Sequence, residues 1–345
     1  MSIANSMNKS TKRLSDVPLS VLDLVPIVVG GTATDSLRNT LDLAQHAEKW
    51  GFNRYWLAEH HNMPGIASSA TSVVIGHVAA GTSKIRVGSG GIMLPNHAPL
   101  VIAEHFGTLE SLFPGRIDLG LGRAPGTDQL TARALRRENR SSGEDFPEQL
   151  HELRTYLNPS LSDGMHVRAI PGEGLNIPIW LLGSSGFSAQ LAGELGLPFA
   201  FAGHFSPDYT LPALQIYRSS FRQSEVLDKP YAMVGVNVIA ADTNEKATWL
   251  ATSLQQQFLS LVRGRPGKLK PPVENIENLW SPYEKNAIQQ QLGAAIIGSP
   301  EVVKEKLQNF LDATQADELM INGQIYDHEE RLRSYEILSQ IVKEE

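Results

Sequence analysis

Short apolar stretches alternate with longer amphipathic ones along most of the chain. Eight of the short stretches have the length and the continuous apolar character of parallel strands that are covered on both faces. We predict strands over residues 19–25, 54–57, 85–88, 117–120, 179–182, 198–202, 234–240 and 318–321. Helical periodicity between and after them predicts helices over residues 35–50, 69–81, 98–112, 146–157, 187–195, 208–224, 243–262, 300–314 and 328–343.

Strand and helix alternating eight times predicts an α/β fold, a (β/α)8 TIM barrel with insertions at the C-terminal face. An open, doubly wound sheet stays possible, because the pattern does not give the strand order. We expect one domain over residues 19–345, preceded by a disordered polar lead-in at residues 1–18. Residues 263–295 are irregular and rich in Pro and Gly, so we interpret them as a lid over the barrel mouth.

The helix predicted over residues 35–50 has recognisable signals at both ends. Thr34 or Asp35 is expected as its N-cap, and Gly51 as its end.

Composition narrows the classes of function. Hydrophobic residues make up 41% of the chain and charged residues 19%, which suits a folded core. A formal charge of −7 argues against nucleic acid or an anionic membrane as partner. The chain has no cysteine, which excludes disulfides, thiolate metal sites and cysteine nucleophiles. We expect a soluble cytoplasmic protein.

Polar and glycine-rich clusters follow several predicted strands directly, where a barrel collects its active site. The second strand runs into Glu59, His60 and His61, and the third into Gly90 and Gly91. The remaining candidates follow the fourth and fifth strands: Arg123, Gly183, Ser184, Ser185, Gly186 and Ser188.

The Glu59-His60-His61 run has three interpretations. Adjacent residues at a strand end point to opposite sides, so the two imidazoles are not expected to serve one site. A metal site is disfavoured because the His-x-x-x-His spacing is missing, and we predict no metal. Histidines that only stabilise loops are a second possibility. We favour one histidine as a general acid or base.

The other clusters suit a cofactor. Small residues at a strand end that leads into a helix offer N–H groups and hydroxyls to a phosphate, as Ser184 and Ser185 do here. Arg123 among glycines can pair with the same anion or form a structural ion pair. Gly90 and Gly91 indicate either a bulge or a flat group pressed against the backbone.

Together these motifs resemble the bacterial-luciferase-like flavin monooxygenases. The matching stretches are WLAEHH at residues 56–61, SGGIMLP at 89–95, GRIDLGLGR at 115–123 and IWLLGSS at 179–185. The resemblance is closest to a bacterial subgroup with the motifs AEHHNMPG and GLGRAPGTD. It implies a catalytic His60 flanked by Glu59 and His61, and a non-prolyl cis peptide at Gly90–Gly91 beneath the flavin ring. Arg123, Ser185 and Ser188 would hold the phosphate.

The resemblance also implies a reaction. The leading hypothesis is a two-component monooxygenase that receives reduced FMN from a separate flavin reductase and oxygenates a small-molecule substrate. Gly122 stands where luminous members carry a cysteine, so light emission is not expected. A homodimer is expected from the family alone. Aromatic residues in the later loops suggest an apolar substrate: Phe205, Trp280 and Tyr283.

Three alternatives stay open. Coenzyme F420 could replace FMN in a hydride-transfer enzyme, with a basic run meeting its acidic tail: Arg133, Arg136, Arg137 and Arg140. The protein could bind flavin without catalysis. A metal-dependent barrel hydrolase is the last alternative.

Overall fold

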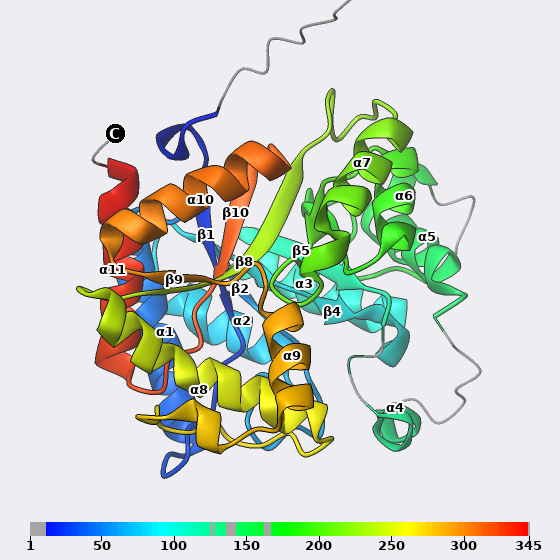
Figure 1. The fold of residues 1–345 in the computed structure, drawn as a ribbon. Helices are drawn as coiled ribbons and strands as arrows, with labels where there is room; N and C mark the ends of the chain where they lie inside the picture. The colour runs from blue at the N-terminus through cyan, green and yellow to red at the C-terminus, as the bar shows by residue number, and fades with distance from the viewer. Residues whose placement is uncertain (1–11, 125, 127, 136–142, 162–166, 344–345) are drawn as a thin grey trace, which may run out of the picture.

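The computed structural model of the chain describes residues 12–124, 126, 128–135, 143–161 and 167–343. Eight parallel strands form a closed barrel with helices around it (Figure 1). The barrel strands are β1 (Leu19–Asp23), β2 (Arg54–Leu57), β3 (Arg86–Ser89), β5 (Ile117–Gly122), β6 (Ile179–Gly183), β7 (Phe199–Phe201), β8 (Ala232–Ala240) and β10 (Glu318–Asn322). Strand β10 closes the barrel because it pairs with both β1 and β8. The predicted (β/α)8 barrel is confirmed, and the open sheet is wrong.

The predicted helices are all present, whereas the helices at residues 129–135 and 282–291 had no counterpart in the prediction. The described helices are α1 (Ala33–Trp50), α2 (Thr71–Ala80), α3 (Pro99–Leu112), α4 (Gln129–Leu135), α5 (Phe146–Leu157), α6 (Gly186–Leu195), α7 (Thr210–Ser220), α8 (Asn244–Val262), α9 (Pro282–Gln291), α10 (Pro300–Thr314) and α11 (His328–Lys343). Two short strands, β4 (Ile92–Met93) and β9 (Ile296–Gly298), pair with β5 and β8 and had no counterpart in the prediction.

Helix α1 begins earlier than predicted, and its N-cap is Thr32 rather than Thr34 or Asp35. The Thr32 side chain accepts a hydrogen bond from Asp35 N at 3.2 Å, and the Asp35 carboxylate accepts one from Thr32 N at 3.0 Å. This is a capping box, and it lies one turn before the first apolar residue of the periodic pattern. Gly51 ends the helix in the left-handed conformation, as predicted.

The strands bury both of their faces. Outward-facing residues join the large core between barrel and helices, for example Val21, Tyr55 and Leu57. Their neighbours on the same strands point inward and form a separate cluster that contains Leu22, Trp56, Trp180, Met233 and Met320. This alternation explains why each strand reads as a continuous apolar run.

The amino-terminal end of the barrel interior holds a layer of buried charges, which we call the ion layer. Arg54 Nη1 lies 2.7 Å from Asp118 Oδ2, and Arg54 Nε lies 3.0 Å from Glu318 Oε1. Arg86 Nη2 lies 2.6 Å from Asp118 Oδ1. Both carboxylates are inaccessible to solvent, and Trp56 Nε1 donates to Asp118 Oδ2 from the layer above. The ion layer therefore fills this end of the barrel.

A small unit made of α8, α9 and β9, which we call the cap, covers part of the carboxyl-terminal end of the barrel. The second half of β8 pairs with β9, and α8 packs against both β9 and α9 in an apolar cluster of their own. The residues before α9 cross the end of β1, where Leu269 N donates to Ile27 O at 2.9 Å. Helix α8 lies below the strands in Figure 1, at the end where β1 and β10 finish.

This arrangement changes two predictions. Residues 263–295 were expected to be irregular, yet they contain α9 and contact the loop after β1; that they act as a lid stays a prediction. Helix α8 was predicted as an ordinary barrel helix, but it packs mainly in the cap, and α10 takes the place beside β8 and α11. A helical pattern alone does not say which surface the helix covers.

The lead-in predicted to be disordered at residues 1–18 is packed in its second part. Leu14 and Val17 are buried, and Lys12 Nζ donates to Ala316 O at 2.9 Å and pairs with Asp317 at 2.7 Å. Only two apolar side chains dock this segment, too few to stand out in its polar sequence. Residues 1–11 lie outside the described residues.

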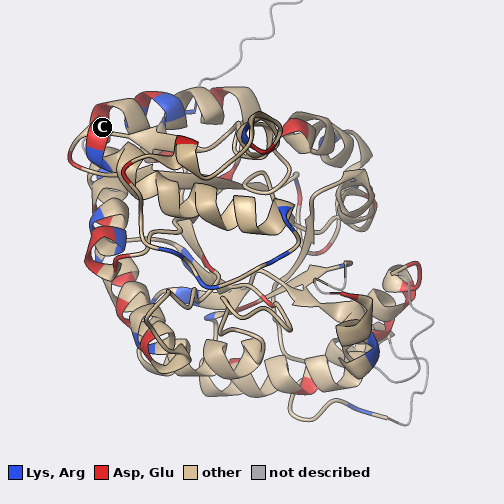
Figure 2. Cartoon of the chain, turned by 60° about the horizontal axis from the view of Figure 1, so that its bottom comes forward, with Lys and Arg blue, Asp and Glu red and all other residues tan. Residues whose placement is uncertain are grey.

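The surface is of mixed charge. In the view of Figure 2, acidic and basic residues are interspersed over the helices. Among the described helices, none combines the length and the apolar character that crossing a membrane requires.

Candidate active site

The predicted site residues lie at one end of the barrel. Residues 59–61 follow β2, Gly90 and Gly91 follow β3, Arg123 follows β5, and residues 183–186 end β6 and begin α6. Because all barrel strands are parallel, these positions share the carboxyl-terminal face. The contacts divide them into a histidine group and an anion-binding group.

His60 and His61 have different partners, as predicted for adjacent residues. His61 Nε2 donates to Glu59 Oε1 at 2.7 Å, whereas His60 Nδ1 donates to the carbonyl of Gly126 at 3.2 Å. A carbonyl oxygen only accepts hydrogen bonds, so Nδ1 carries the proton in His60. The Nε2 of a neutral His60 therefore keeps its lone pair and can accept a proton.

Glu59 organises what we call the Glu59 cluster, formed with His61, His97 and the backbone of Met93. The carboxylate is 1% exposed. Besides His61, it accepts hydrogen bonds from His97 Nε2 at 2.9 Å and from Met93 N at 3.0 Å. Burial alone would raise the pKa of Glu59, but these hydrogen bonds lower the pKa to about 2. Glu59 is a charged acceptor that ties the end of β2 to β4.

His204, which follows β7, is a second imidazole near His60. Burial lowers the pKa of His204 to about 4, with a smaller contribution from His60. Burial also lowers the pKa of His60. Both rings are therefore neutral at pH 7. Gly235 of β8 makes room for the His204 ring, because a Cβ there would lie 2.4 Å from its Nδ1.

His97 and His204 were missed as site residues by the sequence analysis. Both follow strands at the correct end of the barrel, and that position was the available signal. Their partners come from distant segments, which no local pattern gives.

The Glu59 cluster also has a geometry that a metal ion could use. The ligand atoms of Glu59, His61 and His97 lie within 4.8 Å of one another. Hydrogen bonds already connect all three side chains without an ion. The prediction that the protein uses no metal stays a prediction.

Gly90 and Gly91 follow β3 at the same end of the barrel. Their peptide bond is cis, as the resemblance implied. A Cβ on Gly90 would lie 2.7 Å from Leu22 Cδ1, and one on Gly91 would lie 2.8 Å from the carbonyl oxygen of Gly120. A side chain at position 91 would meet backbone, and one at position 90 would press on Leu22 and Trp56, so the two glycines let the backbone itself form this surface.

The anion-binding group surrounds the N-terminus of α6. Ser185 is the N-cap residue, its side chain makes no capping hydrogen bond, and Ser184 and Ser185 are exposed. Arg123 lies over the Phe187 ring, with Cζ 4.3 Å from the ring centroid. The first turn of α6 and a cation therefore face the same space.

Two of the predicted residues in this group, Ser188 and Gly183, lie where α6 packs against β6. Ser188 is 4% exposed, so its side chain lies inside the fold. A Cβ on Gly183 would lie 2.9 Å from Ser188 Cβ, which shows how closely β6 and α6 approach there. Gly186 is the first residue of α6.

The three aromatic residues suggested for the substrate lie after β7, just before α9 and at the start of α9. Tyr283 is 80% exposed at the start of α9, and Phe205 is also exposed, beyond β7. Trp280 lies in the cap, where it lines a different cavity. Their role toward the substrate stays a prediction.

Relatives of this chain share nearly its whole length. It is 66% identical over 334 residues to the protein YvbT of Bacillus subtilis, covering 97% of this chain and 99% of that one. It is 55% identical to a luciferase-like monooxygenase of Escherichia coli, covering 95% and 98%. The N-acetyl-S-alkylcysteine monooxygenase of Bacillus subtilis is 35% identical, covering 94% and 98%.

Solved structures agree with the fold. The crystal structure of apo-MsnO8 has a TM-score of 0.88 at 34% identity, covering 95% of this chain and 98% of that one. Two more distant structures share the fold, with TM-scores of 0.73 and 0.70 at 18% and 16% identity and coverage of 94% to 99%. They are a Pseudomonas putida diketocamphane monooxygenase in complex with FMN and an F420-dependent secondary alcohol dehydrogenase.

The family model described as luciferase-like monooxygenase matches residues 18–317, which is the barrel from β1 to the residue before β10. The chain belongs to the luciferase-like monooxygenase family.

Proposed function

We propose that this protein is the oxygenating component of a two-component monooxygenase, which takes reduced FMN from a separate flavin reductase. Its substrate is a small, largely apolar organic molecule. The observation that supports this most is the common barrel end shared by an anion-binding helix N-terminus and the neutral imidazole of His60. We further expect a homodimer in the cytoplasm.

The described residues fit FMN. The N–H groups at the start of α6, the hydroxyls of Ser184 and Ser185, and the guanidinium of Arg123 would bind its phosphate. The bare backbone of Gly90 and Gly91 would support the flat ring. Reduced FMN, when bound, supplies the two electrons that let one oxygen atom of O2 enter the substrate while the other leaves as water.

His60 would act as the acid–base group. Its Nδ1 is held by Gly126, so Nε2 is the atom that takes and returns a proton. Glu59 would act through position: it fixes His61, His97 and the backbone beside the predicted flavin site, and does not itself transfer protons. The cap would exclude water from the site during turnover.

FMN is favoured over F420 by the size of the anion-binding group. Among the described residues, Arg123 and the N-terminus of α6 suit a single phosphate group, whereas F420 carries an extended acidic tail. Of the basic run suggested for that tail, Arg133 lies on the short helix α4. The other members lie outside the described residues: Arg136, Arg137 and Arg140.

The test is an oxygen-consumption assay with FMN and a flavin reductase that supplies FMNH2. The panel should contain aldehydes, alkanes, sulfonates and, following the relative named above, N-acetyl-S-alkylcysteines. Incorporation of 18O from 18O2 into a product is the expected result. Tight FMN binding without any product would favour a flavin-binding protein, and tighter binding of F420 than of FMN would favour hydride transfer.

A variant pair tests the role of His60. His60→Asn should lower product formation about 100-fold or more without loss of FMN binding, since general acid–base catalysis contributes at least that much. His151→Asn, at an exposed position of α5, is the matched control. Full product formation by His60→Asn would refute the assignment.

A further inference from the structure

The side chain of His204, which follows β7, lies inside the barrel. Residues of β8 alternate between the outer core and the barrel interior, so Gly235 faces inward between Met233 and Asn237. A Cβ on Gly235 would lie 2.4 Å from His204 Nδ1 and 3.2 Å from its Cε1. The imidazole therefore occupies the space that a side chain of β8 would otherwise fill.

Strands β8 and β10 hold the backbone of His204 in place. Asn237 Nδ2 donates to His204 O at 2.8 Å, and Asn237 Oδ1 accepts from Asn322 Nδ2 at 2.9 Å. Both asparagines are 3% exposed. Gly203 packs closely against β8, because a Cβ there would lie 2.7 Å from Gly235 O. A side chain supported in this way is pre-organised for a function.

The two ring nitrogens of His204 have different surroundings. Nδ1 is buried and has no hydrogen-bond partner among the described residues, whereas Nε2 lies in the part of the side chain that is accessible. Burial lowers the pKa of His204 to about 4, so at pH 7 the ring is neutral and carries one proton. A proton on Nδ1 would be a buried donor without an acceptor. The proton therefore belongs on Nε2.

His60 carries its proton on the other nitrogen. Its Nδ1 donates to Gly126 O at 3.2 Å, which leaves Nε2 as an acceptor. The two rings are close, since His60 adds to the effect of burial in lowering the pKa of His204. No hydrogen bond joins them in the described part of the chain. This end of the barrel therefore presents one imidazole acceptor and one imidazole donor.

We propose that His204 determines substrate specificity: its Nε2–H donates a hydrogen bond to an uncharged oxygen of the substrate, such as a carbonyl oxygen. This inference rests on the proposed function, because it concerns the substrate of the same site. His60 then acts on the reacting atoms, and His204 holds the polar group of the substrate. A neutral imidazole offers no counter-charge to a carboxylate. A molecule without an acceptor would leave the N–H unpaired.

NMR of the protein with 15N-labelled histidine tests the proton positions directly. Long-range 1H–15N spectra should show the proton of His204 on Nε2 and that of His60 on Nδ1, and the spectrum of His204→Phe identifies the His204 signals. A proton on Nδ1 of His204 in the wild-type protein would overturn the proposal, even if every variant failed to fold.

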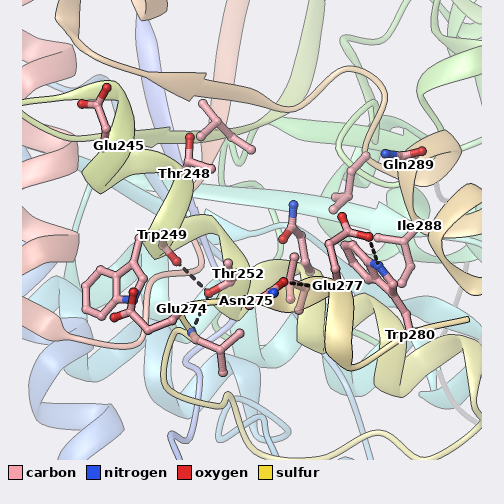
Figure 3. A pocket seen from close by; sticks show the side chains of 15 residues that line it. Glu245, Thr248, Trp249, Thr252, Glu274, Asn275, Glu277, Trp280, Ile288 and Gln289 are labelled. Carbon is pink, nitrogen blue, oxygen red and sulfur yellow. Dashed lines mark hydrogen bonds between the residues drawn. The ribbon is translucent and has the colours of Figure 1, made fainter.

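The same spectra follow binding of 2-heptanone, 2-methyl-1-heptene and heptanoate, with and without FMN. The alkene has nearly the shape of the ketone but lacks the acceptor. The ketone should bind more tightly than either analogue and should shift the His204 signals. Equal affinities, or no binding of the ketone, would overturn the proposal. So would binding only in the hollow of the cap, whose wall in Figure 3 contains neither His60 nor His204, because the His204 signals would then stay unchanged.

Variants separate hydrogen bonding from packing. His204→Phe, followed at the His60 signals, should weaken ketone binding about 3- to 10-fold, as expected for one neutral hydrogen bond, and leave alkene binding unchanged. His204→Gln keeps an N–H donor and should restore part of the affinity. His151→Phe, at an exposed position of α5, is the control and should change nothing. Equal losses for ketone and alkene would show that the ring only packs, and would refute the proposal.

This inference and the proposed function can fail separately. The binding experiments need neither a reductase nor O2. Ketone binding that depends on His204, without any 18O-labelled product, would contradict the proposed function alone. An 18O-labelled product together with unchanged ketone affinity in His204→Phe would contradict only the role of His204.

Discussion

Replacing Glu59 by Gln tests how the candidate site is held together. The substitution keeps the shape of the side chain and removes its charge. In the native protein the carboxylate accepts hydrogen bonds from His61 at 2.7 Å, His97 at 2.9 Å and Met93 N at 3.0 Å. An amide presents one oxygen and one NH2 group, so at least one of these donors loses its acceptor.

The magnitude follows from the pKa of Glu59, which is lowered from 4.5 to about 2. A difference of roughly 2.5 units corresponds to about 3 kcal/mol of unfolding free energy at neutral pH. Because the folded pKa lies below the unfolded one, this stability is present above pH 4.5 and is lost as the pH falls toward 2. Near pH 3.5, ionisation of Glu59 should still contribute about 2 kcal/mol to the unfolding free energy.

The assay is urea unfolding of the wild-type protein and Glu59→Gln at several pH values, followed by tryptophan fluorescence. The difference in unfolding free energy should be largest at neutral pH and should become smaller below pH 4.5. Glu305→Gln serves as a surface control that removes the same charge. A difference below about 1 kcal/mol at pH 7, or one that does not change with pH, would refute the reasoning.

Three further predictions concern other parts of the molecule. Arg123→Gln should weaken FMN binding about tenfold or more and leave riboflavin binding unchanged, because riboflavin lacks the phosphate; equal losses for both ligands would contradict this. Asp118→Asn removes the carboxylate that pairs with Arg54 and Arg86, so the free energy of unfolding measured in urea should fall by about 3 kcal/mol or more. An unchanged free energy of unfolding would refute our account of the ion layer. Metal analysis should find substoichiometric metal, and bound metal that is lost in His97→Ala would overturn that expectation.

The strands, and the shared barrel end at which the candidate site residues lie, were predictable because their signals are local. A strand covered on both faces is a short apolar run, and β2 was predicted with its observed ends. Polar and glycine residues directly after such runs do lie together at the carboxyl-terminal end of the barrel. The capping box of α1 was present in the sequence as Thr32 and Asp35, so its omission was an error of interpretation and not a lack of signal.

The remaining features depend on contacts between distant segments. Asp118 lies 64 residues from Arg54, and Glu318 lies 264 residues from it. Each looks like an isolated charge within a strand until the barrel closes. Helix α8 has the same periodicity as the barrel helices, and only its contacts with α9 and β9 show that it belongs to the cap.

The two ends of the barrel interior have opposite characters, and this difference bears on access to the site. The ion layer fills the amino-terminal end, and above it Trp56 and Trp180 pack edge to face with centroids 5.2 Å apart. Above these rings lie Gly90 and Gly91, since a Cβ on Gly90 would come within 3.1 Å of Trp56 Cβ. A molecule cannot pass through these packed layers. In the proposed reaction, a substrate would therefore reach the candidate site from the carboxyl-terminal end of the barrel, which the cap partly covers, so changes in the cap should alter access without altering His60.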